Sequence, residues 1–144
     1  MTTRLYSHSI YLEHLTPAGH PERPDRLRAI QRVLEDEAFQ YLDRREAPDG
    51  DEAAILHAHP EEHRERVRQR IPQEGLARID ADTTASPLSW QAALTAIGAA
   101  NAAVDDVFSG AADNVFVAAR PPGHHAEKTT AMGFCFFNNA AIAA

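Results

Sequence analysis

Residues 114–126, NVFVAARPPGHHA, join a continuous apolar run to a loop that holds two prolines, a glycine and two adjacent histidines. The apolar run at 114–119 is typical of a strand that is buried on both faces of a parallel sheet. In open α/β sheets, the loops that leave the carboxyl ends of the strands form the crevice where ligands bind. We therefore expect the functional residues in the loop that begins at Arg120.

The segments before residue 114 alternate between strand and helix patterns. We expect one strand at 4–12, which runs into a loop, and another at 39–47. We expect a helix from Pro24 to near Glu37, a short helix opened by Asp51, and a helix that begins at 60–62. The longest expected helix runs from Ser86 to Gly110. Residues 16–24 contain three prolines and predict a rigid connection, whereas 73–86 predicts an exposed acidic loop. This alternation predicts an α/β fold with a parallel sheet.

The longest expected helix carries one apolar stripe. Its members are Trp90, Leu94, Ile97, Val104 and Phe108, with Asn101 as the single interruption. Gly98 and the alanines beside the stripe would let another backbone approach closely. Gly98 costs about 1 kcal/mol of helix propensity relative to alanine, so we expect it to have a packing reason.

Composition limits the class of protein and its partners. The chain has 144 residues, a length that allows one domain at most. Of these residues, 21 are acidic and 14 are basic, which gives a net charge of −7. The acidic balance, with Lys128 as the one lysine, argues against nucleic acid or an anionic membrane as a direct partner. Cys135 is the one cysteine, which excludes a disulfide framework and a Cys-rich zinc cluster, so we expect a reducing, cytoplasmic location.

His124 and His125 are the candidates for proton chemistry. Imidazole has an unperturbed pKa of about 6.5, so one histidine can take a proton from a nucleophilic water and return it to a leaving group. Two adjacent imidazoles disfavour double protonation, which lets one remain a base while its neighbour stabilises charge. Taken alone, a pair of adjacent histidines is more often two structural histidines in a turn.

The loop and the segment after it resemble a known family. RPPGHHA at 120–126, followed by GFCFFNN at 133–139, is similar to the signature of the zinc-dependent histone deacetylases, which include acetylpolyamine amidohydrolases. The similarity extends to TPAGHPERPDRL at 16–27 and DTTASPLSWQAALTAIG at 82–98. The resemblance implies a three-layer, arginase-like α/β fold with a parallel sheet, and hydrolysis of acetyl amides on lysine or polyamine nitrogens. It further implies that residues 1–144 form the amino-terminal part of a single domain, incomplete at its carboxyl end.

The resemblance also implies roles for residues in and after the histidine loop. His125 resembles the general base that later acts as general acid, and His124 resembles the partner that mainly stabilises charge. Phe134 resembles a wall of the narrow tunnel that receives the acyl-lysine chain. Gly133 matches the position whose backbone carbonyl faces the substrate amide, and Cys135 matches a buried thiol near the metal and the interior cavity.

Three further residues take their roles from the same resemblance. Asp82 falls where the family places a polar rim residue that holds the substrate backbone, although an exposed acidic loop with Asp80 is the simpler interpretation. His20 and Arg26 resemble residues that line an interior cavity through which released acetate could pass. For Arg26, an exposed cation at the start of a helix is the alternative.

The family chemistry also implies a zinc ion, held by an Asp-x-His pair and a further Asp. No residue of 1–144 matches one of these ligands. As metal ligands, five histidines are rejected in favour of structural or surface roles: His8, His14, His20, His57 and His59. Three hypotheses follow: a fragment of an active metalloenzyme, which we favour, a non-catalytic remnant, or one half of a split enzyme. A sheet that ends at this strand would leave Val115 and Val117 beside an open edge, with weakly cooperative unfolding as the expected result.

Overall fold

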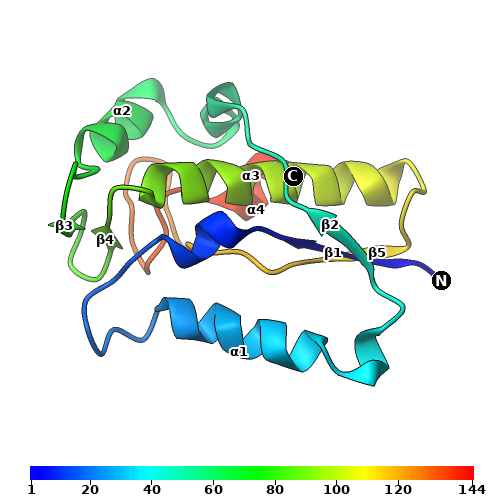
Figure 1. The fold of residues 1–144 in the computed structure, drawn as a ribbon. Coiled ribbons are helices and arrows are strands. Elements are labelled where there is room, and N and C mark those ends of the chain that lie inside the picture. The colour runs from blue at the N-terminus through cyan, green and yellow to red at the C-terminus, as the bar shows by residue number, and fades with distance from the viewer.

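The structure is a computed structural model that describes residues 1–144. A parallel sheet between helices forms its centre. The strands are β1 (Thr3–Ser7), β2 (Asp43–Glu46) and β5 (Asn114–Val117), in the order β2-β1-β5. Both pairings are parallel, with Leu5 opposite Arg44 on one side and Phe116 on the other. Figure 1 shows α1 on one face of this sheet and α3 on the other, which confirms the α/β layers.

The remaining elements surround this centre. The helices are α1 (Pro24–Leu34), α2 (Glu61–Gln69), α3 (Ser89–Phe108) and α4 (Asn139–Ala143), and short 3₁₀ turns lie at Ser9–Leu12, Glu37–Phe39 and Glu52–His57. A two-stranded antiparallel ribbon is formed by β3 (Ala77–Arg78) and β4 (Thr84–Ala85). None of the helices has both the length and the apolar character that crossing a bilayer would require.

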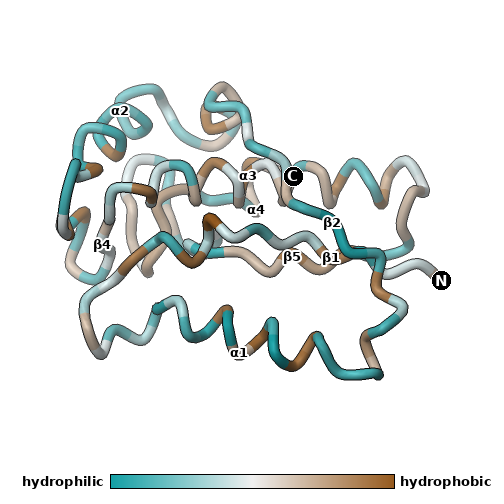
Figure 2. Tube along the Cα trace, in the orientation of Figure 1, coloured by the Kyte–Doolittle hydropathy of each residue, from teal (hydrophilic) through white to brown (hydrophobic).

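Helix α1 begins where the sequence predicts. Pro24 occupies the first turn, where its missing N–H costs nothing, and Leu27 and Leu34 are buried against the sheet. Figure 2 shows polar and apolar residues alternating along this helix, the pattern of one buried face. The helix ends at Leu34 and not near Glu37, because Asp36 caps a separate 3₁₀ turn by accepting a hydrogen bond from the Ala38 N–H at 2.9 Å.

Helix α3 packs its amino-terminal half against the core. All of its buried residues lie between Ser89 and Ala99. Gly98 has the expected packing reason, since a β carbon there would lie 2.7 Å from the backbone nitrogen of Gly50. The predicted stripe is wrong at its end, where Phe108 is 89% exposed, because the last turns of the helix reach beyond the packed interior.

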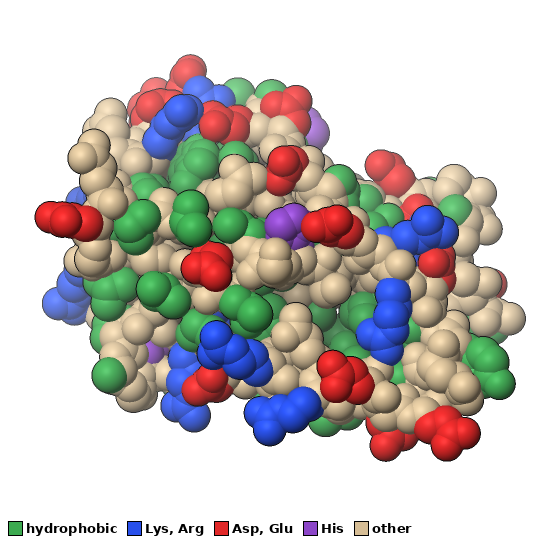
Figure 3. Space-filling view, in the orientation of Figure 1, with side chains coloured by type: hydrophobic (Ala, Val, Ile, Leu, Met, Phe, Trp, Pro, Cys, Tyr) green, Lys and Arg blue, Asp and Glu red, His purple; other side chains and the backbone are tan.

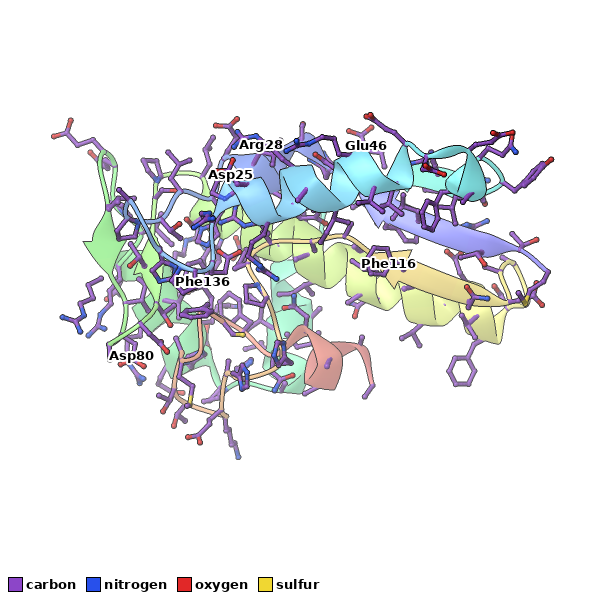
Figure 4. All side chains as sticks on the ribbon, turned by 90° about the horizontal axis from the view of Figure 1, so that it is seen from below. Asp25, Arg28, Glu46, Asp80, Phe116 and Phe136 are labelled. Carbon is purple, nitrogen blue, oxygen red and sulfur yellow. The ribbon has the colours of Figure 1, made fainter.

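The strand at 114–117 differs from the expectation that both of its faces are buried. It pairs only with β1 and therefore forms an edge of the sheet, as predicted for Val115 and Val117. Val115 and Val117 are half-buried, whereas Phe116 is 46% exposed (Figure 4). Side chains alternate along a strand, so Phe116 points away from the side on which Val115 and Val117 pack against the core.

Three other segments are shorter or more ordered than predicted. The first strand ends at Ser7, because the His8 Nδ1 atom accepts a hydrogen bond from the Ile10 N–H at 2.9 Å and so starts a 3₁₀ turn. The second strand is confined to Asp43–Glu46. The expected acidic loop contains the ribbon β3–β4. Ile79 and Thr83, which lie between the two strands, are buried.

The core has two parts, and one of them holds the segment after the histidine loop. Phe136 and Phe137 are fully buried with Ile55, Val67 and Ile97 in the part above the sheet (Phe136 is labelled in Figure 4). The other part lies between the sheet, α1 and α3; its buried members are Leu5, Tyr6, Tyr11, Leu27, Leu34, Ala47, Ala92, Ala96, Ala99 and Ala118. The two aromatic residues therefore anchor the end of the functional segment in the interior.

Candidate active site

His124 and His125 lie side by side at the wall of an open cavity. Their ring centroids are 4.2 Å apart, with the ring planes tilted by 46°, and both side chains are exposed. The cavity has a volume of about 520 Å³. The other residues that line it are Pro21, Glu22, Arg26, Pro122, Gly133 and Phe134. The two imidazoles are thus adjacent and accessible from one space, as shared proton chemistry requires.

A buried ion pair fixes the beginning of the histidine loop. Arg120 is 1% exposed and forms two hydrogen bonds with the Glu22 carboxylate, from Nε to Oε1 at 2.6 Å and from Nη2 to Oε2 at 2.7 Å. Its Nη1 atom donates to the backbone carbonyls of Tyr11 and His14, at 2.8 and 2.9 Å. A bidentate Arg–carboxylate pair fixes the relative orientation of its two side chains and also neutralises their charges. The pair therefore joins the loop after β5 to the loop before α1.

The ionisation of this cluster follows from its burial and its partners. Burial alone would raise the pKa of Glu22, but hydrogen bonds from His14 and Arg120 outweigh it and lower that pKa to about 2. Burial lowers the pKa of His14, whose Nδ1 atom lies 2.7 Å from Ser89 Oγ. The carboxylate is therefore charged and the imidazole neutral at neutral pH.

Gly133 and Phe134 form a turn that faces the histidine pair. Both have a positive φ, of 58° and 69°, a region that a side chain such as that of Phe134 rarely adopts. A β carbon on Gly133 would lie 2.6 Å from the His125 β carbon, so the close approach requires glycine. The Gly133 N–H donates to Asp82 Oδ1 at 3.1 Å, which holds the turn from the opposite side.

Phe134 separates the histidine cavity from a second one. Its ring packs edge-on against His20, with centroids 4.9 Å apart, and His20 Nε2 donates to the Asp82 carbonyl at 3.2 Å. His20, Asp82 and Phe134 line this second cavity, whose volume is about 750 Å³. Asp82, predicted as a rim residue, and His20, predicted to line an interior cavity, therefore both lie beside the turn and line the second cavity, not the histidine cavity.

Cys135 lies beneath the histidine loop. It is fully buried, its thiol donates to the Gly133 carbonyl at 3.3 Å, and its sulfur accepts a hydrogen bond from the His125 N–H at 3.5 Å. These contacts agree with the interpretation as a buried thiol near the site. Cys135 lines neither of the two cavities, and the thiol instead holds the backbone of His125 against the turn at Gly133.

The structure brings most of the predicted site residues to the two neighbouring cavities. The histidine cavity receives His124, His125, Gly133, Phe134 and Arg26, and the second receives His20 and Asp82. Arg26 Nη1 lies 3.2 Å from Glu22 Oε1, and its side chain is half exposed. Residues 1–144 include no group of three or more His, Cys, Asp or Glu side chains placed to hold a metal ion.

Several residues that organise the site were not singled out from the sequence. These are Glu22, Arg120, His63, Asn138 and Asn139. His59, interpreted from the sequence as structural or at the surface, is buried and structural. The β carbon that Gly123 lacks would collide with the Asn139 side chain, and the Ala140 N–H donates to the Gly123 carbonyl at 3.1 Å. The repeated asparagines at the start of α4 were the available signal, since asparagine is a strong helix cap.

Comparisons with known proteins identify the family of this chain. The sequence model of the histone deacetylase domain matches residues 20–144. The chain belongs to the histone deacetylase family. A "Histone deacetylase-like amidohydrolase" of Pseudomonas aeruginosa is 37% identical over 127 residues, which cover 88% of this chain and 33% of that protein. The human "Polyamine deacetylase HDAC10" is 37% identical over 136 residues, covering 89% of this chain and 20% of that one.

A solved structure supports the fold of this histone deacetylase family member. The crystal structure of the HDA15 HD domain superimposes with a TM-score of 0.90 and 35% sequence identity. The match covers 99% of this chain and 42% of the solved chain. A "Probable deacetylase" of Archaeoglobus fulgidus is 33% identical over 99% of this chain and 40% of its own length. The chain thus spans less than half the length of each of these relatives, and its fold is arginase-like α/β.

Proposed function

We propose that residues 1–144 provide the substrate cavity and the proton-transferring histidines of a deacetylase that hydrolyses acetyl amides of lysine or polyamines. The observation that carries this proposal is the pair of imidazoles, 4.2 Å apart, at the wall of one cavity. Family membership and the deacetylases among the relatives support the reaction class. We also propose a cytoplasmic location, on the basis of the single cysteine.

The reaction assigns a distinct task to each histidine. Water adds to the acetyl carbonyl carbon while His125 accepts one of its protons, and the C–N bond then breaks as His125 returns that proton to the amine nitrogen. The products are acetate and the free amine. In this proposal His124, whose ring centroid lies 4.2 Å from that of His125, stabilises the charge that develops on the carbonyl oxygen.

The turn and its surroundings position the substrate in this proposal. Phe134 forms an apolar wall for the aliphatic chain of an acyl-lysine or polyamine, and the Gly133 carbonyl accepts the substrate amide N–H. Asp82 at the rim offers a carboxylate to the polar part of the substrate. Of the three residues expected around an interior path for acetate, only Arg26 lines the histidine cavity, so we keep that role for Arg26 alone. His20 lines the second cavity beside Asp82, and Cys135 lines neither cavity.

The zinc ion implied by the family does not fit residues 1–144 by themselves. The side chains described here include no group of three ligands, so no step above passes through a metal. We propose that any zinc ligands belong to polypeptide other than these residues. The same observation is the one that favours a second candidate, in which the chain is a non-catalytic remnant or one half of a split enzyme.

The test is acetate release by the complete translated protein that contains residues 1–144. The substrates are an acetyl-lysine peptide and an N-acetylated polyamine, assayed with zinc in the buffer. His125→Ala should lower kcat/KM by roughly 10²- to 10⁴-fold, the usual contribution of general acid–base catalysis. His57→Ala, which alters an exposed histidine outside both cavities, should leave the rate unchanged. Failure to hydrolyse either substrate would contradict the proposal and favour the second candidate.

A further inference from the structure

We infer that His59 is a positioning residue, whose two ring nitrogens hold the segment that presents His124, His125, Gly133 and Phe134. This inference rests on the proposed function only because it treats that segment as catalytic. His59 lies between the 3₁₀ turn Glu52–His57 and α2, and it is 2% exposed. It is therefore distant in sequence from the residues that it would hold.

Both nitrogens of the His59 ring have backbone partners in this segment. The Nδ1 atom lies 3.1 Å from the Lys128 carbonyl, and the Nε2 atom lies 2.9 Å from the backbone nitrogen of Asn138. A carbonyl can only accept and an N–H can only donate, so Nδ1 must carry the proton and Nε2 must be bare. The ring thus joins two points of the chain that are ten residues apart, and the Gly133–Phe134 turn lies between them.

Asn138 passes this restraint on to the histidine loop. Its side-chain Nδ2 atom donates to the Ala126 carbonyl at 3.0 Å and lies 3.5 Å from the His124 carbonyl. Its Oδ1 atom caps α4 by accepting from the Ala141 N–H at 3.0 Å. A single residue held by His59 therefore contacts the backbone of the proposed catalytic pair, without His59 itself reaching the cavity.

His63 supports the His59 ring. The two rings are stacked with centroids 4.7 Å apart, both pack against Phe137, and His63 Nε2 donates to the Phe136 carbonyl at 3.0 Å. The titratable residues that face His59 are His63 from α2, and Glu127 and Lys128 from the loop through their backbone carbonyls. No carboxylate forms an ion pair with the ring, so nothing there favours its charged form over the neutral one.

The restraint requires a neutral ring. Burial lowers the pKa of His59, and although the Lys128 carbonyl raises it, the nearby His63 lowers it further. A protonated Nε2 would place an N–H against the Asn138 N–H, two donors with no acceptor between them. Positioning by His59 is consequently present at neutral pH and is lost in acid.

The first test reads the tautomer of His59 in the wild-type protein. Long-range ¹H–¹⁵N spectra of the imidazoles distinguish a protonated nitrogen from a bare one. Between pH 6 and 8, His59 should show a protonated Nδ1 and a bare Nε2, and His63 a protonated Nε2. A protonated Nε2 on His59 would overturn the inference, and this reading needs no variant and no activity.

The second test compares two variants that separate hydrogen bonding from packing. His59→Phe keeps an aromatic ring against Phe137 but removes both hydrogen bonds, and it should speed hydrogen exchange of the Asn138 amide at least tenfold. His59→Gln keeps an acceptor near the Nε2 position and should restore most of the protection. The Ile97 amide, in the core of α3, should exchange at the wild-type rate in both variants. Wild-type protection of Asn138 in His59→Phe would refute the positioning role.

An activity measurement then separates this inference from the proposed function. In the complete protein, His59→Phe should lower kcat for acetate release more than it raises KM, and His59→Gln should recover part of the loss. Equal losses in the two variants would mean that His59 acts by packing alone. If the wild-type protein released no acetate while the tautomer and exchange results held, the deacetylase proposal would fail and the positioning of the segment would stand.

Discussion

At the scale of single residues, Gly133 sets the distance between the turn and the proposed base. Gly133→Ala would place a β carbon 2.6 Å from the His125 β carbon. We expect it to lower the free energy of unfolding by about 1–3 kcal/mol beyond the cost of an alanine at positive φ, which is the range for overpacking. Urea denaturation measures this loss.

Gly75→Ala is the matched control for this substitution. Gly75 also has a positive φ, of 67°, but a β carbon there would meet nothing within 4 Å. The free energy of unfolding of Gly75→Ala should fall only by the cost of holding an alanine at positive φ, about 1–2 kcal/mol. If the two variants lost the same stability, the contact between Gly133 and His125 would not restrain the site.

The pair of Glu22 and Arg120 gives a second prediction at this scale. Arg120→Met leaves a buried carboxylate without its main partner and should cost about 3–5 kcal/mol in the free energy of unfolding. Arg28→Met removes a surface pair with Asp25, 2.8 Å apart and half exposed (Figure 4), and should cost less than about 1 kcal/mol. Thermal or urea denaturation checks the contrast, which would be refuted by equal losses.

The sequence singles out the proposed reacting residues but not the residues that hold them. His124 and His125 could be found because they are adjacent and follow an apolar strand. Glu22 and Arg120 are 98 residues apart, and no local pattern indicates that they meet. His59 is similar, since its partners Lys128 and Asn138 are 69 and 79 residues away. Long-range polar contacts depend on the folded topology and leave no periodic signal.

At the scale of elements, α3 and the loop at 48–50 approach too closely for side chains. Replacing glycine by alanine in a helix normally stabilises it by about 1 kcal/mol. Gly98→Ala should instead destabilise the protein by about 1–3 kcal/mol, because the new β carbon would lie 2.7 Å from the Gly50 nitrogen. The midpoint of urea denaturation gives the sign directly.

Asn101→Ala is the control on the same helix. The buried Asn101 Oδ1 atom has no hydrogen-bond partner, so its removal should be neutral or stabilising. Both variants introduce an alanine into α3, and only the first meets a neighbouring backbone. A Gly98→Ala protein as stable as wild type would show that the loop can move away.

Element boundaries were predicted where a residue fixes them chemically. Pro24 marked the start of α1, and Asp51 marked the turn that it caps through the Ala53 N–H. The end of the α3 stripe at Phe108 was wrong, because periodicity shows which residues share a face but not how far the packed interior extends. The ribbon β3–β4 has two residues in each strand, too few for an alternating pattern.

At the scale of the whole molecule, the buried carboxylate makes stability depend on acid pH. The pKa of Glu22 falls from 4.5 in the unfolded chain to about 2 in the folded protein. A depressed folded pKa stabilises the protein above pH 4.5, and this stabilisation is lost as the pH falls toward 2. The loss should be at most about 3.5 kcal/mol, since the pKa falls by about 2.5 units and one unit corresponds to about 1.4 kcal/mol.

The Glu22→Gln variant tests this pH dependence. It should be less stable than wild type at pH 7, but its free energy of unfolding should change less between pH 4.5 and 2. Equal slopes for the two proteins in urea denaturation at several pH values would exclude Glu22 as the source. Acidic and basic side chains are interspersed on the face shown in Figure 3. Asp43 also has a lowered pKa, because Arg45 and Arg4 bond to its carboxylate. Burial alone would raise the pKa of Asp106, but the hydrogen bond from Arg4 outweighs it and lowers that pKa. These carboxylates are present in both proteins, so we expect them to add the same slope to each.

The fold class and the family could both be predicted from the sequence as a whole. An apolar strand, an amphipathic helix and a Pro-rich loop are local features, and they were sufficient for a parallel α/β fold with its site after β5. The division of the site into two cavities by Phe134 was not predictable, because it depends on the contact between that ring and His20.

The most direct measurement for the central claim is the isotopic composition of released acetate. The complete protein is incubated with an acetyl-lysine peptide in H₂¹⁸O, and the acetate is analysed by mass spectrometry. The account predicts one ¹⁸O atom per acetate at early times, and a rate at least about 100-fold lower in His125→Ala. Acetate without ¹⁸O, or an unchanged rate in His125→Ala, would contradict water activation by the histidine pair.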